Sequence, residues 1–376
     1  MKVGFIPMAL VEDGFSGNHF YEERTWKDVK RGYCHFQNGD IGIAKISPCF
    51  ENRKSTIFKN LPNTYGAGTT ELVILRPIKV YTKFYLYLFK SDWYVKEGTK
   101  YFKGVVGQQR VHKEIFTDLH IPLPPFAEQQ RIVEEIEYWF ALIDQIEQDK
   151  SDLQTAIRQT KSKILDLAIH GKLVPQNPND EPASELLKRI NPKAEITCDN
   201  GHYPVGWIDV ILGDIFYHNT GKALNSSNKE GVLRNYLTTS NVYWNQFDLS
   251  LVKQMPFRDN ELEKCTVQKG DLLVCEGGDV GRSAIWNFDY NICIQNHIHR
   301  LRPKGDLNVS FYYYVLRFLK EHNRIGGKGI GLLGLSSNEL HKIGMPLPPR
   351  KEQDRIVLKI EELFSVLDNI ENALEA

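Results

Sequence analysis

The sequence has no long hydrophobic run, no paired cysteines and no basic leader. No stretch of about 18 apolar residues is present, so we expect no membrane-spanning helix and no membrane partner. The opening residues, MKVGFIPMALVEDG, lack the basic start and apolar core of a secretory signal. The six cysteines form no Cys-x-x-Cys pair. These absences predict a reduced, cytoplasmic globular protein, long enough at 376 residues for two domains.

Motifs of the common enzyme classes are also missing. The chain contains no GxxxxGK[ST] loop, no HExxH and no GxSxG elbow, and it lacks the glycine-rich loop and Asn-Pro-Pro-aromatic string of methyltransferases. Cys293, His297 and His299 are possible metal ligands, but no convincing fourth ligand accompanies them. Asp271 follows Gly270 and is better explained as a turn residue than as a nuclease carboxylate. We therefore predict no catalytic residue, no metal site and no cofactor in this chain.

The net charge is zero, but the charge is unevenly distributed. Lys and Arg outnumber Asp and Glu by 18 to 12 in residues 1–125 and by 16 to 14 in residues 206–349. Asp and Glu are in excess by 9 to 6 in residues 126–175, by 5 to 3 in residues 176–205 and by 7 to 4 in residues 350–376. This division indicates that the globular parts, rich in Lys and Arg, suit a polyanion and that the acidic parts joining them suit protein partners. The alternative is that each charge run is simply a solvated face.

One string occurs twice. PLPPFAEQQRIVEEI at 122–136 and PLPPRKEQDRIVLKI at 346–360 share ten of fifteen positions. Consecutive prolines cannot continue a strand ladder or enter a helix interior, so each string predicts the end of a globular domain. The Glu-Gln pair that follows should lie in the first turn of a helix and satisfy its free N–H groups.

The duplication extends beyond these two strings, whose Pro-Leu-Pro-Pro segments (122–125 and 346–349) we call the proline clamps. Each half also carries a Gly-Asp turn before an apolar run, an Arg-Pro that ends a strand-like run, and an aromatic stretch. A period this long predicts a duplicated domain rather than a solenoid. The matched strings are NGDIGIAKI (38–46) and KGDLLVCEGG (269–278), ELVILRP (71–77) and HIHRLRP (297–303), and KFYLYLFKS (83–91) and SFYYYVLRF (310–318).

Heptad patterns follow both clamps. The first pattern extends over 36 residues, which as a helix is a rod on the order of 54 Å long. A helix that buries one narrow stripe needs a partner, so we predict that the two helices pair as a coiled coil. The alternative is that each helix covers the core of its own domain. The predicted interface residues are Ile132, Ile136, Trp139, Ile143, Ile146, Leu153, Ile157, Ile164, Leu167, Ile356, Ile360, Leu363, Leu367 and Ile370.

The predicted loops are rich in neutral and basic hydrogen-bonding side chains. Arg, Lys, Asn and Gln can read base edges in the major groove, and Lys, Ser and Thr suit phosphates. For any one of these residues, an ordinary surface role is the alternative. The predicted DNA-binding residues are Ser47, Arg53, Lys54, Thr69, Thr70, Lys103, Gln108, Gln109, Arg110, Lys222, Asn225, Ser227, Asn228, Arg234, Asn241, Arg282, Gln295, Asn296, His297 and Lys328.

Together these strings resemble the specificity subunit of type I restriction–modification enzymes. The resemblance rests on GDIGIAKISPCFENRKS and the clamp in the first half. In the second half it rests on YLTTSNVYWNQFDLS, GDLLVCEGGDVGRSAIW and the second clamp, with HGKLVPQNPNDEPASELL between the halves. It covers nearly the whole chain.

The resemblance implies an α+β fold with two mixed α/β target recognition domains, separated by long helices that pair as an antiparallel coiled coil. Each domain would read one half of an asymmetric, bipartite site in double-stranded DNA, and the helices would set the spacer at roughly one turn or more. Methyltransferase and restriction (motor) subunits are the implied partners, and they would carry S-adenosylmethionine, ATP and Mg. The complex would methylate adenine and restrict DNA, while this chain is not itself an enzyme.

The resemblance also sets the expected boundaries. The string FIPM at residues 5–8 aligns with YLTT at residues 236–239. We therefore expect the first domain to have no counterpart of the strand and loop that open the second domain at about residue 206. We expect the first domain to be either impaired or completed by another chain. The predicted parts are a shortened recognition domain (1–125), a conserved-region helix (126–175), a linker (176–205), a recognition domain (206–349) and a short second helix (350–376).

Overall fold

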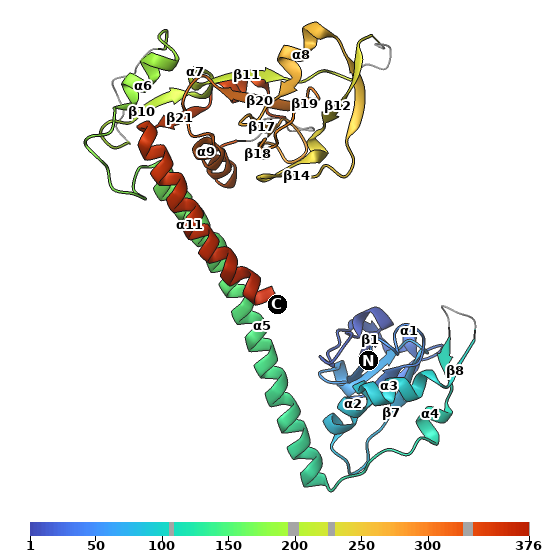
Figure 1. Ribbon diagram of the computed structural model, residues 1–376. Coiled ribbons are helices and arrows are strands. Elements are labelled where there is room, and N and C mark those ends of the chain that lie inside the picture. The colour runs from blue at the N-terminus through green and yellow to red at the C-terminus, as the bar shows by residue number, and fades with distance from the viewer. Residues whose placement is uncertain (105–108, 195–202, 225–229, 326–333, 376) are drawn as a thin grey trace. The chain divides into compact units, whose positions relative to one another are not determined.

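The computed structural model describes residues 1–104, 109–194, 203–224, 230–325 and 334–375. It divides into two compact units, unit 1 (Met1–Gln148) and unit 2 (Asp149–Ala376). Both are mixtures of short strands and helices (Figure 1), so the predicted α+β class is confirmed. No helix of the described residues is both long and apolar enough to cross a membrane.

Unit 1 contains two small sheets, with strand orders β2-β1-β6-β3 and β5-β4-β7, and a β8-β9 ladder. Its buried core forms where α2 packs on the fully buried strand β4. The elements are β1 (Lys2–Ile6), η1 (Met8–Leu10), β2 (Glu22–Thr25), α1 (Trp26–Val29), β3 (Cys34–Gln37), β4 (Ile41–Ala44), β5 (Ser55–Ile57), η2 (Pro62–Thr64), β6 (Tyr65–Gly68), β7 (Leu72–Leu75), α2 (Thr82–Lys90), α3 (Asp92–Thr99), β8 (Phe102–Lys103), β9 (Arg110–Val111), α4 (Glu114–Thr117) and the start of α5 (Phe126–Ile169).

Unit 2 has sheets of order β15-β12-β19-β16 and β11-β20-β17-β18, with β10-β21 and β13-β14 ladders. The aromatic helix α9 packs inside the largest core cluster. The elements are α6 (Ala183–Ile190), β10 (Ile208–Ile211), α7 (Leu212–Ile215), β11 (Phe216–Thr220), β12 (Val232–Leu237), η3 (Thr239–Asn241), β13 (Val242–Tyr243), β14 (Gln246–Phe247), β15 (Lys253–Phe257), α8 (Asp259–Cys265), β16 (Thr266–Val267), β17 (Leu272–Cys275), β18 (Ser283–Ile285), β19 (Ile292–Ile294), β20 (Ile298–Pro303), α9 (Val309–Glu321), α10 (Ser337–His341), β21 (Gly344–Leu347) and α11 (Arg350–Glu375).

The two units share one strand plan. The order β2-β1-β6-β3 matches β15-β12-β19-β16, and in both sheets the two central strands are parallel while the outer pairs are antiparallel. The order β5-β4-β7 matches β18-β17-β20. Unit 2 adds β11 beside β20 and β10 beside β21, whereas the described residues of unit 1 contain no strand equivalent to either. Residues 206–220, which include β10 and β11, are the segment for which the sequence predicted no counterpart in the first half.

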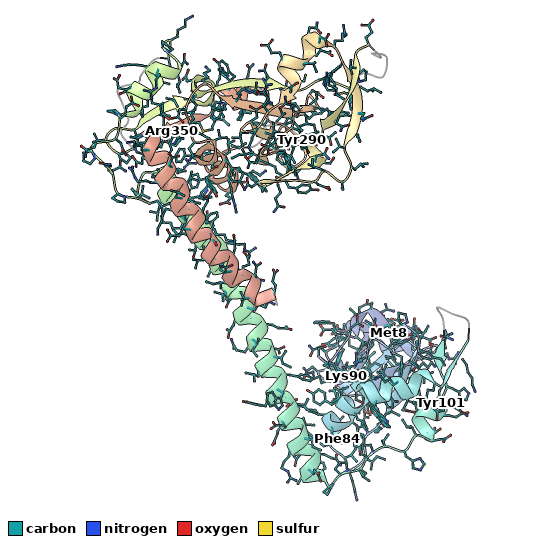
Figure 2. The ribbon with its side chains drawn as sticks, viewed as in Figure 1. Met8, Phe84, Lys90, Tyr101, Tyr290 and Arg350 are labelled. Carbon is teal, nitrogen blue, oxygen red and sulfur yellow. The ribbon has the colours of Figure 1, made fainter. Side chains whose placement is uncertain are left out.

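Each long helix begins directly after its proline clamp, α5 at Phe126 and α11 at Arg350 (labelled in Figure 2). Proline carbonyls, rather than the Glu-Gln side chains, accept the first helical N–H groups. The N–H of Gln129 bonds the carbonyl of Pro125 at 3.0 Å, and that of Gln353 bonds Pro349 at 3.0 Å. Glu128 and Glu352 lie in the first turn of their helices, as predicted. The glutamine side chains instead bond groups outside the helix.

Both glutamines fasten their helix to the preceding domain. The Gln129 amide donates to the carbonyl of Pro124 and accepts from the N–H of Tyr81, each at 2.8 Å. Gln353 repeats both bonds at 2.9 Å, with Pro348 and Asn308. Both glutamine side chains are buried. The same joint thus fixes the start of each helix.

In unit 2, α11 lies antiparallel to the end of α5 (Figure 1). Lys161 bonds Asp368 at 2.6 Å and Glu371 at 2.7 Å, while Gln176, just beyond α5, bonds Glu352 near the start of α11 at 2.6 Å. Helix pairing is therefore confirmed. The alternative also holds in part, because both helices pack into the core of unit 2.

The predicted interface residues fall into groups of different burial. The pairing places Ile157, Ile164, Ile356 and Ile360 in buried positions and Leu167, Leu363 and Leu367 in half-buried ones. Ile132 is half-buried against the core of unit 1, and Ile136 is also half-buried. The exposed positions are Trp139, Ile143, Ile146, Leu153 and Ile370.

Candidate nucleic-acid interface

The parallel strand pair defines one edge in each unit. Parallel strands end at the same side of a sheet, so the loops that follow them meet there. In unit 2 the pair is β12 and β19, with register Leu237 opposite Ile294. In unit 1 it is β1 and β6, with Ile6 opposite Gly68. Of the predicted DNA-binding residues, Thr69 and Thr70 come directly after β6, and residues 295–297 come directly after β19.

In unit 2 this edge is built by interlocked loops. Lys222, after β11, and Gln295, after β19, form an isolated parallel bridge. The N–H of Asn296 donates to the carbonyl of Lys222 at 3.0 Å. The carbonyl of His297 accepts from the N–H of Glu276, the first residue after β17, at 3.0 Å. Lys222 and the run 295–297, predicted from two separate strings, therefore lie on adjacent loops.

Arg282 and His297 supply donors and acceptors on this edge. Arg282 Nη2 donates to the carbonyl of Thr239 at 2.6 Å, and its guanidinium lies 4.9 Å from the ring centroid of Tyr243. The His297 side chain is 55 % exposed, and its Nδ1 lies 3.0 Å from a carboxylate oxygen of Glu276. Side chains of these types can bond base edges.

The corresponding edge of unit 1 uses the loop after β4 and the start of β9. The N–H of Ser47 donates to the carbonyl of Gln109 at 2.8 Å. Arg110 Nε donates to Glu71 at 2.9 Å, and this bond lowers the pKa of the Glu71 carboxyl. The turn between β6 and β7 adds Thr69 and Thr70 to this edge.

Several predicted cations point into their own unit. Lys54 Nζ donates to the carbonyl of Val11 at 2.7 Å, and Lys222 Nζ donates to Glu261 at 2.6 Å. Arg53 Nε donates to the Lys90 carbonyl at 2.8 Å, and the buried Lys90 Nζ donates to the Arg53 carbonyl at 2.9 Å. Lys90 is labelled in Figure 2. These side chains stabilise the loops that carry the edge.

Other predicted residues lie apart from these contacts. Asn241 is buried, and its side chain bonds Thr238, Asp248 and Leu251. Arg234 is exposed on β12, on the wall of a cavity, and Lys103 is exposed on β8. DNA contact by the whole set stays a prediction. Gln108, Asn225, Ser227, Asn228 and Lys328 lie outside the described residues.

Each unit contains a buried Asp–Arg ion pair that was not predicted from the sequence. Arg302 donates two bonds to the buried Asp271, and Arg76 donates two bonds, each of 2.8 Å, to the buried Asp40. Burial alone would raise the pKa of Asp40, but the bonds from Arg76 and from the Gln37 N–H outweigh it and lower that pKa. The signal was present, because both halves carry Gly-Asp and then Arg-Pro in the same order.

A histidine cluster lies behind the unit 2 edge. His218 Nε2 is 3.0 Å from His299 Nδ1, and the ring of His218 lies alongside that of His341 with centroids 6.4 Å apart. Burial, followed by the charges of the two neighbouring histidines, lowers the pKa of His218 to about 4. His299 is fully buried and bonds the carbonyl of Leu335 at 2.8 Å. Among the described residues, no group of three His, Cys, Asp or Glu side chains is arranged to hold a metal ion.

The chain matches the family described as "Type I restriction modification DNA specificity domain" over residues 33–155 and 204–376. The chain belongs to this family of type I restriction–modification specificity subunits. Among curated relatives, the Escherichia coli EcoAI specificity subunit is 31% identical over 98% of this chain and 74% of its own length. The Escherichia coli EcoEI specificity subunit is 30% identical over 100% of this chain and 76% of its own length.

Solved structures of the family share the fold. The HsdS subunit from Thermoanaerobacter tengcongensis superposes with a TM-score of 0.63 at 18% identity, over 100% of this chain and 87% of that chain. A chain from a study of complex assembly and conformational transition in the type I restriction–modification system gives 0.66 at 18% identity, with the same coverage of both chains. At these identities the likeness concerns the fold alone.

Proposed function

We propose that this chain is the DNA-reading subunit of a type I restriction–modification complex. Unit 1 and unit 2 each read one half of an asymmetric, bipartite double-stranded DNA site through the loop edges described above. The chain has no catalytic role of its own, and it determines where the complex methylates adenine and restricts DNA.

The observation that carries this proposal is the duplicated edge in a member of the specificity family. Two units of the same strand plan present polar loops after the same parallel strand pair. The residues on those loops differ between the units, as in Thr69 and Thr70 after β6 against Gln295 and Asn296 after β19. Different side chains on equivalent loops would read different bases, hence the proposed asymmetry.

The long helices are the proposed scaffold. Exposed apolar side chains on α5, including Trp139, Ile143 and Ile146, offer a surface for the methyltransferase subunits. The helices would set the number of unread base pairs, and α5 with its 44 residues is about 66 Å long. S-adenosylmethionine would be bound by the methyltransferase subunits, and ATP and Mg by the restriction subunits.

Methylation mapping tests the proposal. The chain is expressed with its cognate methyltransferase subunit in cells free of other adenine methylation, and modified bases are located by long-read sequencing. A bipartite, asymmetric motif is the expected result. A motif with one defined half would show that one unit does not read DNA, and no methylation with an active partner would overturn the proposal.

Two alternatives have separate outcomes. A self-contained nuclease or methyltransferase would modify DNA when the chain is purified alone. A pure protein scaffold would bind no DNA, so a salt titration separates it. A reader that neutralises phosphates loses affinity steeply with salt, by about 10³–10⁵ between 50 and 200 mM for six to ten phosphate contacts.

A further inference from the structure

Unit 2 has a cavity bounded by α8, β11 and β20, which are labelled in Figure 1. Its volume is about 470 Å³, within the range of small-molecule sites. Three cations line it, Lys264, Arg300 and Arg302, together with the carboxylate of Glu263. None of the lining residues is a predicted DNA-binding residue. Strand β20 leads away from the loop edge, and Arg302 lies roughly 13 Å along it from Ile298.

Arg300 carries a buried charge that the protein does not neutralise. The residue is 3% exposed, and in the part of the chain that the structure describes it forms no ion pair. The nearby Asp271 accepts two bonds from Arg302 instead. Burial lowers the pKa of the Arg300 guanidinium, and the charge of Arg302 lowers it further. Because an unpaired buried charge is costly, these observations indicate that the partner of Arg300 is an anion from outside the chain.

The hydrogen bonds of Arg300 are also incomplete. Its Nη1 donates to the carbonyl of Glu263 at 3.0 Å and to that of Thr266 at 2.5 Å. Its Nε is buried and has no hydrogen-bond partner. The alternative role of Arg300 is to hold the end of α8 through these two carbonyls. That role needs only Nη1, so it explains neither the uncompensated charge nor the cavity beside it.

Unit 1 shows that the shared fold does not require an arginine at this position. The strings HIHRLRP and ELVILRP place Arg300 opposite Ile74 in the alignment and Arg302 opposite Arg76. The strand registers agree, because Arg300 faces Leu273 and Ile74 faces Gly42, the residues two places after the matched Gly-Asp aspartates. Ile74 packs against an apolar cluster. Arg300 is therefore a feature of unit 2 alone and needs its own explanation.

The lining suits a phosphate group. A guanidinium bonds phosphate oxygens through parallel N–H groups, and the exposed Lys264 adds a second positive charge. Glu263 is exposed and opposes them with a single negative charge. The ring of Tyr217 and the amides of Asn219 and Asn260 also line the cavity and can contact an organic group attached to the phosphate.

The burial of Arg300 favours a small molecule over DNA. A phosphate of duplex DNA carries a sugar on each side, so its oxygens cannot approach a side chain that is 3% exposed. A free phosphate or a phosphate monoester has three oxygens that are not esterified and can enter the cavity with these oxygens first.

We propose that this cavity binds the phosphate group of a small molecule, either free phosphate or a phosphate monoester. Arg300 is the main ligand of the phosphate, and Lys264 is the second. The site is separate from the loop edge that reads DNA. The inference therefore goes beyond the proposed function and holds whichever DNA site the chain reads.

Isothermal titration calorimetry of the full-length chain tests the proposal. The probes are inorganic phosphate and adenosine monophosphate, each in phosphate-free buffer at constant ionic strength, so that general screening of charge does not change. The chain should bind at least one of them with a dissociation constant below about 1 mM. Tighter binding of adenosine monophosphate would identify a monoester as the ligand, and equal binding would identify free phosphate.

Variants locate the binding. Arg300→Ile introduces the unit 1 residue and should weaken phosphate binding roughly tenfold or more, because charge-assisted bonds are lost. Lys264→Ala changes an exposed side chain, so the chain should stay folded, and it should weaken binding by a smaller factor. Arg31→Ile, at an exposed position in unit 1, is the control and should bind as the wild type does.

Three results would overturn the proposal. The first is the absence of binding of both probes at about 10 mM, where a site of the expected affinity is saturated. The second is unchanged affinity in Arg300→Ile, or in Lys264→Ala if Arg300→Ile does not fold. The third is displacement of bound phosphate by duplex DNA, because the cavity would then belong to the DNA-binding surface. If Arg300 only holds α8, phosphate should raise the melting temperature of Arg300→Ile as much as that of the wild type.

Discussion

Arg302 donates two parallel hydrogen bonds to Asp271, from Nε at 2.8 Å and from Nη2 at 2.6 Å. Asp271 also accepts a bond from the N–H of Gln268 at 2.8 Å, and it is almost fully buried. The pair ties the end of β20 to the turn that precedes β17. Asp40 and Arg76 repeat this arrangement in unit 1.

Replacing Arg302 with leucine should destabilise unit 2, because it leaves the buried Asp271 charge without its cation. We expect the free energy of unfolding to fall by about 2–4 kcal/mol. Hydrogen exchange of β17 and β20 measures the change. Adding Asp271→Asn should recover part of the loss, since the unpaired charge is removed. Wild-type exchange in the single variant would contradict the prediction.

The stability of unit 2 should fall below neutral pH. Folded His218 has a pKa of about 4, whereas the unfolded side chain titrates near 6.5. The unfolded chain therefore binds more protons between these values, so stability is fully present above pH 6.5 and is lost as pH falls towards 4. Thermal unfolding at pH 5 and 7.5 checks this.

Two variants identify the source of this pH dependence. His218→Gln should reduce the difference in melting temperature between pH 5 and 7.5. It should not abolish the difference, because burial also lowers the pKa of His299. His297→Gln, at an exposed position, is the control and should reduce the difference less than His218→Gln does. An equal effect of the two variants would refute the assignment to His218.

Docking of α11 should depend on Ile360. This side chain is fully buried between α11 and the core that includes α5. Ile360→Ala should cost about 2–4 kcal/mol, the usual cost of a large-to-small change in a core, and should speed proteolysis of α11. Val366→Ala, at a 55% exposed position on the same helix, is the control and should cleave at the wild-type rate.

Loop-edge substitutions should relax one half-site at a time. His297→Ala should reduce discrimination at one position of the unit 2 half-site by about 1–3 kcal/mol, or roughly 5- to 160-fold, if this side chain reads a base. Gln109→Ala should act on the other half-site. Competition binding with single-base variants of the methylated motif provides the measurement, and Lys359→Ala on α11 provides the control. Uniform weakening across all sequences would instead indicate phosphate contact.

Much of the fold could be predicted because both halves repeat residues that fix the local backbone. Prolines, the Gly-Asp turns and the heptads each constrain backbone within a few residues, so the helix starts at Phe126 and Arg350 follow from the sequence. The described residues of unit 1 contain no equivalent of β10 or β11, which agrees with the match of residues 5–8 to residues 236–239. The extent of helix pairing could not be predicted. A heptad pattern shows that a helix has an apolar stripe to bury, but it does not show which element packs against that stripe.

The candidate interface was harder to predict from residue type. Lys54 and Lys222 belong to loops of the expected character, yet their amines bond Val11 and Glu261 inside their units. A lysine in a loop can bond a phosphate or a nearby carbonyl, and only the folded backbone decides which is in reach. The Asp271–Arg302 pair was overlooked for the converse reason, because its residues are 31 positions apart and were considered separately.

The glutamine joint makes the recognition units exchangeable. Gln129 and Gln353 bond only backbone groups of the preceding domain, at 2.8–2.9 Å, so the joint does not depend on the side chains that unit presents. A gene crossover within the shared Pro-Leu-Pro-Pro codons would graft a different unit onto either helix with every bond of the joint preserved. New specificities could then arise by recombination in one step, without a period of selection for a new interface.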